Sequence, residues 1–199
     1  MSDVAGRLVD YYEREMAERA TRPRGEERER RLAAFLDMVR REGFTSVVEV
    51  GCGAGRDGVV IARAGVAYTG LDLTPAAVGL CRGLGLDAHV GRATELPFEK
   101  DAFDAAWTMS TLMHLPGDEM VTALAELRRV VRTGGLIEVG VWGSDTSGEW
   151  TDDGGRYFRS RSDDELRGLL AAVGEVVAFD TWTHFTDGGH YQWARVVVA

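Results

Sequence analysis

The chain has 199 residues, a length that suits one domain with its own core and leaves no room for a separate substrate domain of ordinary size. An apolar fraction of 45% and a charged fraction of 28% are typical of a globular protein in water. The 23 basic and 32 acidic residues give a net charge of -9, which argues against a broad basic surface for nucleic acid.

The N-terminal residues carry charges throughout and contain no apolar segment of the kind found in a secretory signal. No apolar run approaches the roughly 18 residues that a membrane span needs. We therefore expect a cytoplasmic protein without membrane contact. The two cysteines, Cys52 and Cys81, have neither metal-ligand spacing nor the pattern of a disulfide framework, so we expect no metal.

Two helices are predicted first, over residues 8–20 and 26–42, with a break at Pro23 and Gly25 between them. In the second, apolar residues recur at the helical spacing i, i+3, i+4, i+7. Strands and helices then alternate. The expected elements are strand 47–50, helix 55–64, strand 67–72, helix 75–82, strand 87–90, strand 103–109, helix 118–132 and strand 136–142.

This alternation predicts an α/β fold with a parallel sheet. The remainder of the chain has a different pattern. A capping box at residues 162–165 begins a last helix that ends near Val173. Two β-rich segments, 176–183 and 192–198, flank the turn-forming residues Asp187–Gly189 and predict an antiparallel hairpin that completes the sheet. Residues 143–155 form the longest expected loop.

The glycine-rich stretch after the first expected strand fits two ligand classes. Residues 53–58 spell G-x-G-x-x-G, which indicates a dinucleotide, whereas residues 49–55 spell E-x-G-x-G-x-G, which indicates a nucleoside cofactor without pyrophosphate. Asp72 ends the second strand at a distance that suits a ribose ligand in either register. Glu49 would be a poor neighbour for a pyrophosphate, and no Tyr-x-x-x-Lys pair is present, so the second register is favoured.

From about residue 45 onward, the chain resembles the class I S-adenosylmethionine-dependent methyltransferases. The matching segments, in family order, are VVEVGCGAG, YTGLDLT, VGRATELPFEKDAFDAAW, LMHL and ELRRVVRTGGLIEV. The resemblance implies a Rossmann-like, doubly wound, seven-stranded sheet in which only the last strand is antiparallel, with added N-terminal helices. It also implies a helical lid or cap at residues 1–43 and a methyltransferase domain at 44–199, together forming one compact unit.

The resemblance further implies that the chain binds S-adenosyl-L-methionine and releases S-adenosyl-L-homocysteine. The implied cofactor-binding residues are Glu49, Gly51, Cys52, Gly53, Gly55, Asp72, Leu73, Arg92, Ala93, Thr94, Thr108, Met109 and Ser110. Arg92 stands where relatives often have an aspartate that accepts a hydrogen bond from adenine, and a guanidinium cannot accept one. Our hypothesis is that Thr94 or Glu95 supplies the missing acceptor.

On the acceptor side, His114 is the candidate general base. The candidates for a lid or a substrate pocket are Tyr11, Tyr12, Trp142, Tyr157 and Arg159. The arginine-rich segment 22–31 is interleaved with acids and is interpreted as a solvated helix face.

These features predict methyl transfer to an O, N or C atom of a small molecule by a monomer or homodimer. The alternatives are an enzyme that methylates tRNA or another RNA, a nicotinamide-binding oxidoreductase, and a non-catalytic cofactor-binding protein.

Overall fold

The computed structural model describes residues 3–183 and 189–199, and its main sheet has seven strands in the order β3-β2-β1-β4-β5-β9-β8. The strands are β1 (Ser46–Val50), β2 (Ala67–Asp72), β3 (Asp87–Val90), β4 (Phe103–Met109), β5 (Val131–Gly143), β8 (Gly174–Thr183) and β9 (His190–Val198). Strands β1 to β5 pair in parallel, and β9 is antiparallel to both of its neighbours, β5 and β8. The predicted fold class is confirmed, with the antiparallel strand inserted one place from the edge.

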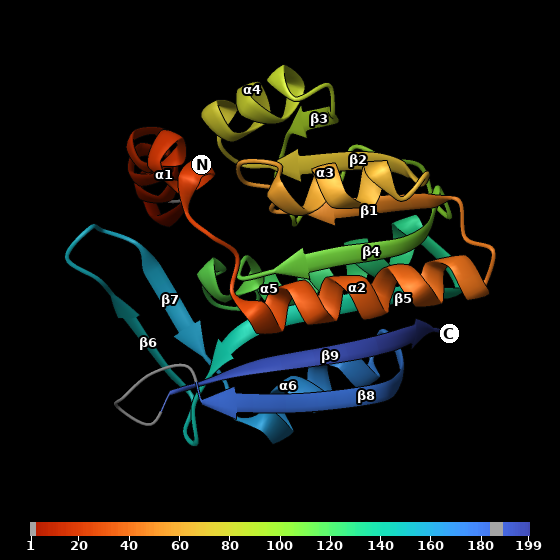
Figure 1. The fold of residues 1–199 in the computed structure, drawn as a ribbon. Coiled ribbons are helices and arrows are strands. Elements are labelled where there is room, and N and C mark those ends of the chain that lie inside the picture. Colours follow the sequence, from red (N-terminus) through yellow and green to blue (C-terminus); the bar gives the residue numbers. More distant parts are fainter. Residues whose placement is uncertain (1–2, 184–188) are drawn as a thin grey trace.

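Helices cover both faces of this sheet (Figure 1). They are α1 (Asp3–Thr21), α2 (Glu26–Arg41), α3 (Arg56–Arg63), α4 (Pro75–Gly83), η1 (Leu112–His114), α5 (Glu119–Val130) and α6 (Asp163–Ala171). The apolar faces of α2, α3 and α4 share one core cluster with β1 and β4, while α5 and α6 share another on the opposite face. Phe35 and Val39 of α2 are fully buried in the first cluster, so α2 is part of the core.

Helix α1 lies apart from both face layers, at the end of the sheet where β1, β2 and β4 terminate (Figure 1). It is attached mainly through a small cluster in which Met16 packs with Ala54 and Ala77. The Glu13 carboxylate also accepts a hydrogen bond from the backbone N–H of Ala76, in the first turn of α4, over 2.9 Å. No helix in the described ranges combines the length and hydropathy needed to cross a bilayer.

The element boundaries differ from the expected ones in three places. Helix α1 begins at Asp3, earlier than the expected residue 8. Helix α5 ends at Val130 and β5 starts at Val131, because Phe103 pairs with Val131 before the ladder shifts register and Gly134 turns at a φ of 75°. The expected long loop contains β6 (Gly148–Thr151), which pairs with β7 (Tyr157–Ser160) in a separate two-stranded sheet.

The expected final hairpin exists as the β8–β9 pair. Residues 187 and 188 of its expected turn lie outside the described residues.

Tyr68 of β2 fills a slot that two glycines leave open beneath the loop after β1. A Cβ on Gly58 would lie 2.5 Å from Tyr68 Cζ, and one on Gly70 would lie 2.7 Å from the Tyr68 hydroxyl oxygen. The hydroxyl donates to Glu49 Oε2 over 2.7 Å, with both side chains buried. Gly58 therefore serves helix–strand packing between α3 and β2.

We predict that Gly58→Ala lowers the free energy of unfolding by about 1–3 kcal/mol, because the added methyl group overpacks the Tyr68 slot. The matched control is Gly79→Ala on α4, where a Cβ has no neighbour within 4 Å. This control should stabilise the protein by about 0.5–1 kcal/mol through helix propensity alone. Urea unfolding of the two variants measures the contrast, and equal stabilisation of both would contradict the overpacking argument.

Candidate active site

A pocket lies at the carboxyl ends of β1, β2 and β4, and residues of α1 form part of its wall. The sheet order reverses direction here, since β1 has β2 on one side and β4 on the other. Ligands of open α/β sheets bind at such switch points. The expected residues that line the pocket are Glu49, Gly51, Cys52, Gly53, Asp72, Leu73, Arg92, Ala93, Thr94, Met109, Ser110, Tyr12 and His114.

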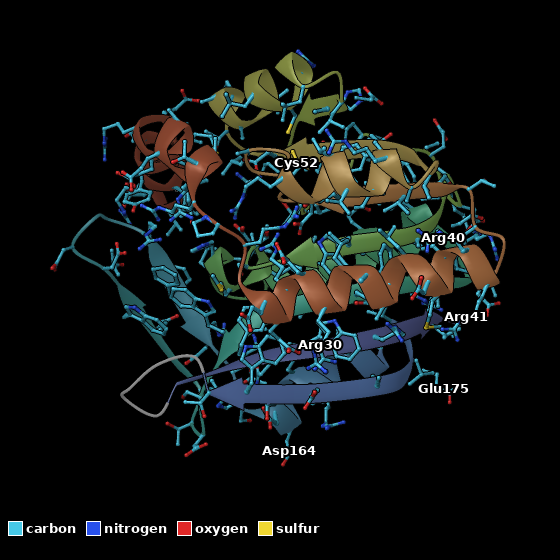
Figure 2. The ribbon with its side chains drawn as sticks, in the orientation of Figure 1. Arg30, Arg40, Arg41, Cys52, Asp164 and Glu175 are labelled. Carbon is cyan, nitrogen blue, oxygen red and sulfur yellow. The ribbon has the colours of Figure 1, made fainter. Side chains whose placement is uncertain are left out.

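The glycine loop after β1 is held close against its neighbours. Gly51 has a φ of 81°, and a Cβ there would collide with the Thr111 side chain. Its N–H donates to the Leu71 carbonyl over 2.7 Å. Figure 2 places Cys52 on this loop, below α4. The chain can therefore turn here only with glycine, which keeps the loop backbone on the pocket surface.

The carboxylate of Asp72 joins this loop to the end of β2. It accepts hydrogen bonds from Gly53 N at Oδ2 and from Thr74 N at Oδ1, each over 2.9 Å. Burial raises the pKa of Asp72, and the backbone donors of Thr74 and Gly53 act in the opposite direction. The Thr74 side chain and the Leu73 backbone also act on this carboxylate, which lines the pocket. Carboxylate oxygens can each accept more than one hydrogen bond, so Asp72 is suited to bind a vicinal diol such as that of a ribose.

The carboxyl group of Glu49 is buried behind the glycine loop. Burial, and next the nearby Asp57 carboxylate, raise the pKa of Glu49 well above its ordinary range. Asp57, at the start of α3, accepts from Arg28 Nε over 2.7 Å and from Trp107 Nε1 over 2.9 Å. Neither Asp57 nor Arg28 was predicted from the sequence, although both line the pocket.

The opposite end of the pocket is formed by residues 91–94 and by Glu119, at the start of α5. Arg92 Nη2 lies 3.4 Å from Glu119 Oε2, and Arg92 Nε lies 3.4 Å from Thr94 Oγ1. Of the two residues in our hypothesis, Thr94 lines the pocket, whereas Glu95 is exposed and outside its wall. Glu119 is an additional acceptor that local sequence reading missed.

His114 lies between α1 and β7 with both ring nitrogens engaged. Its Nδ1 is 2.8 Å from the Tyr157 carbonyl oxygen, and its Nε2 is 3.0 Å from the Tyr12 hydroxyl. Because a carbonyl only accepts, Nδ1 carries the proton. Burial lowers the pKa of His114 to about 4, with the charges of Arg156 and Arg19 adding to the effect. The ring is therefore neutral at pH 7, and Nε2 accepts from Tyr12.

Several expected site residues lie outside the pocket wall. Gly55 instead begins α3 at a φ of 75°, and Thr108 is fully buried within β4, on the opposite side of the strand from Met109. Trp142 stacks on Phe158 at 4.8 Å, and Phe158 also stacks on Trp150 at 5.2 Å. The expected aromatic lining thus packs against the β6–β7 sheet.

The other three candidates for a lid or a substrate pocket, Tyr11, Tyr157 and Arg159, contact neighbouring elements and do not line the pocket. Tyr11 lies beneath the Arg156 guanidinium, 4.6 Å from its ring centre, and Arg159 donates to the Gly117 carbonyl over 2.7 Å. Tyr157 reaches His114 through its backbone carbonyl while its hydroxyl donates to Glu149 over 2.6 Å. These contacts join the β6–β7 sheet to η1 and α1.

Comparison with known proteins matches residues 48–139 to a family described as a methyltransferase domain. A phthiotriol/phenolphthiotriol dimycocerosates methyltransferase from Mycobacterium leprae is 36% identical over 54% of this chain and 42% of its own length. A tRNA (carboxymethyluridine(34)-5-O)-methyltransferase from Arabidopsis thaliana is 29% identical over 64% of this chain and 32% of its own. The chain thus spans less than half the length of these curated relatives.

Among solved structures, the 1,6-didemethyltoxoflavin-N1-methyltransferase of Burkholderia thailandensis, with S-adenosylhomocysteine bound, superposes with a TM-score of 0.80. The superposition covers 98% of this chain and 88% of the other, at 24% sequence identity. This likeness establishes the fold. Residues 48–139 match the methyltransferase-domain family, and the whole chain shares the fold of this methyltransferase structure.

We predict that the depressed pKa of His114 makes stability depend on pH. Between the ordinary value of 6.5 and about 4, the unfolded chain binds a proton that the folded chain does not. The contribution of neutral His114 is therefore complete above pH 6.5 and is lost as the pH falls toward 4, by roughly 3 kcal/mol. Urea unfolding between pH 7 and 4.5 should show a shallower slope for His114→Gln than for the parent, and equal slopes would refute the assignment.

Proposed function

We propose that this protein binds S-adenosyl-L-methionine in the pocket under α1 and transfers its methyl group to a small-molecule acceptor. The observation that carries the proposal is the Asp72 carboxylate, which lines the pocket, is held by the backbone N–H groups of Gly53 and Thr74, and is suited to accept from a ribose diol. The glycine loop beside it brings backbone to the pocket surface and fits a nucleoside cofactor.

Residues from both ends of the pocket would hold this cofactor. The loop from Gly51 to Gly53 would contact the amino-acid portion and ribose, and Leu73 would pack on the adenine. We further propose that Glu119, with Thr94, supplies the acceptor for the adenine amino group in place of the usual aspartate. The Arg92–Glu119 ion pair supports this role because it holds the carboxylate at the pocket wall.

The bound cofactor supplies an electrophilic methyl group on a positively charged sulfur. The residues of the chain would align the acceptor and exclude water, which are the main requirements of such a transfer. The α1 helix would act as the lid, since its residues Leu8, Tyr12 and Met16 line the pocket.

The Tyr12–His114 hydrogen bond gives the site a route for a proton. A methyl acceptor whose O–H or N–H group donates a hydrogen bond to the Tyr12 oxygen would transfer that proton to Tyr12. At the same time, the Tyr12 hydroxyl proton would move to His114 Nε2. The weak basicity of His114 suits hydroxyl and weakly acidic ring N–H nucleophiles, whose methylated cations are strong acids. It does not suit an alkylammonium, which holds its proton too firmly.

A small-molecule acceptor is favoured over RNA by the charge distribution. On the outer face of α2, Arg30 and Arg40 pair with Glu27 and Asp37 within the same helix. Figure 2 shows Arg30, Arg40 and Arg41 projecting from different positions along α2, so they do not form a compact patch. The interpretation of this segment as a solvated face fits Arg30 but not Arg28, which turns inward to Asp57.

Calorimetry with S-adenosylhomocysteine tests the cofactor assignment. We expect binding at a stoichiometry of about one per chain, and a loss of at least tenfold in affinity for Asp72→Asn, because the amide halves the acceptor capacity facing the ribose. NADH should give no heat. Binding of NADH with no response to S-adenosylhomocysteine would support the oxidoreductase alternative. Strong salt-dependent tRNA binding would support the RNA alternative.

Adenine recognition has its own test. Glu119→Gln and Thr94→Val should each weaken S-adenosylhomocysteine binding, by about 3- to 10-fold for one hydrogen bond. Glu95→Gln is the matched control, since Glu95 does not line the pocket, and its affinity should stay at the parent value. Unchanged affinity in both wall variants would disprove the proposed acceptors.

A further inference from the structure

We propose that the turn between β6 and β7, residues 152–156, is a latch that holds α1 over the pocket, and that ligands enter and leave only when α1 moves away from this turn. The inference rests on the proposed function and deepens it by assigning a second element to the control of ligand exchange. Both the turn and α1 lie outside the matched methyltransferase segment, residues 48–139. Figure 1 shows α1 and the β6–β7 pair at the same end of the main sheet.

Helix α1 uses one face for the pocket and another for the turn. Residues three or four apart along a helix lie on one face. The α1 residues that line the pocket follow this spacing and are Val4, Ala5, Leu8, Tyr12, Met16 and Arg19. Arg7 and Tyr11, also four residues apart, meet the turn instead. A Cβ on Gly154 would lie 2.6 Å from Tyr11 Cε2, and one on Gly155 would lie 3.9 Å from Arg7 Cδ.

The turn is braced by its own hydrogen bonds. The N–H of Gly155 donates to the Asp152 carbonyl over 2.9 Å, and the N–H of Asp152 donates to the Arg156 carbonyl over 3.0 Å. The Asp152 carboxylate accepts from the Arg156 backbone N–H over 2.9 Å and from Arg156 Nε over 2.8 Å. The Arg156 side chain is therefore fixed in direction, which lowers the entropy cost of its contact with α1.

The guanidinium group of Arg156 joins α1 to β7. It lies 4.6 Å from the centre of the Tyr11 ring and 5.0 Å from the centre of the Phe158 ring. A guanidinium within about 6 Å of an aromatic face is attracted by the quadrupole of the ring, and more strongly where water is excluded. Because the Arg156 side chain is only 19% exposed, this contact is stronger than one on an open surface.

Two neighbours of α1 share the task of holding it. On one side, Met16 packs with Ala54 and Ala77, in the glycine loop and α4. On the other side, Tyr11 meets the latch. Neither Tyr11 nor the latch residues line the pocket, so their effect on a ligand must pass through the position of α1.

A latch of this kind governs rates more than equilibrium. Its contacts with α1 need no bound ligand, so they stabilise the closed position in the free and the loaded protein alike. Weakening them raises the open population in both states, and association and dissociation then accelerate by the same factor. Loss of a side chain that contacts the ligand would instead act mainly on dissociation.

Surface plasmon resonance with S-adenosylhomocysteine on the immobilised full chain measures both rates. For Arg156→Gln we expect association and dissociation to be about 3- to 10-fold faster, the effect of one partly buried cation–π contact, with a dissociation constant within about twofold of the parent value. Tyr11→Leu removes the ring and keeps the Arg156–Asp152 ion pair, and it should give the same result.

The matched control is Arg167→Gln on α6. The guanidinium of Arg167 lies 3.7 Å from the centre of the Phe179 ring, in a cation–π pair that involves neither α1 nor the turn. The substitution therefore removes the same kind of contact from another part of the molecule. Both rates of this control should match those of the parent.

Hydrogen exchange in the ligand-free protein provides a readout that needs no ligand. The amides of α1, residues 3–21, should exchange faster in Arg156→Gln and Tyr11→Leu than in the parent or in Arg167→Gln, because a helix that detaches more often is less protected. Mass spectrometry of peptides from this segment measures the difference.

Unchanged rates in Arg156→Gln and Tyr11→Leu, or unchanged exchange in α1, would overturn the latch. Faster dissociation with an unchanged association rate would make these residues ligand contacts and would also overturn it. If the parent does not bind S-adenosylhomocysteine, the proposed function fails, and hydrogen exchange still decides whether the latch exists. If the parent binds it and only the variants behave otherwise than expected, the latch fails and the proposed function stands.

Discussion

The pocket depends on one hydrogen bond, from the backbone N–H of Gly53 to the carboxylate of Asp72. It joins the loop after β1 to the end of β2, two strands that are already paired in parallel register. The bond leaves part of the carboxylate available, so the same group that fixes the loop can also bind a ligand. Without this bond, the loop would still be held by the hydrogen bonds from the N–H groups of Gly51 and Cys52 to the Leu71 carbonyl, but not at Gly53 N.

The loop is supported from below by Tyr68, which does not line the pocket. Tyr68 rises into the slot left by Gly58 and Gly70 and donates to Glu49. Burial raises the pKa of Glu49 well above its ordinary range. At this end of the pocket, the guanidinium groups of Arg19, Arg28 and Arg56 share the wall with the Asp57 carboxylate, which accepts from Arg28. This physical arrangement links the core packing of α3 to the electrostatics of the ligand site.

Helix α1 connects the pocket to the β6–β7 sheet. Tyr12 of α1 contacts His114, whose other nitrogen donates to the Tyr157 carbonyl of β7. The neighbouring Tyr11 lies beneath Arg156, just before β7. A change in the position of α1 would therefore alter the environment of His114 as well as the opening of the pocket. The proposed lid and the proposed proton route therefore share one contact network.

The sequence by itself determined the sheet, the glycine loop and Asp72, because apolar periodicity, positive-φ glycines and strand-end acids are local patterns. It also singled out His114 and Tyr12, but not their contact, which joins residues 102 positions apart. Tertiary structure alone placed Arg28, Asp57 and Glu119 in the pocket wall, since their local sequence resembles ordinary charged helix. It also moved Trp142, Tyr157 and Thr108 out of the pocket wall. The physical reason is that burial and charge pairing depend on which elements the fold brings together, and spacing along the chain does not encode that.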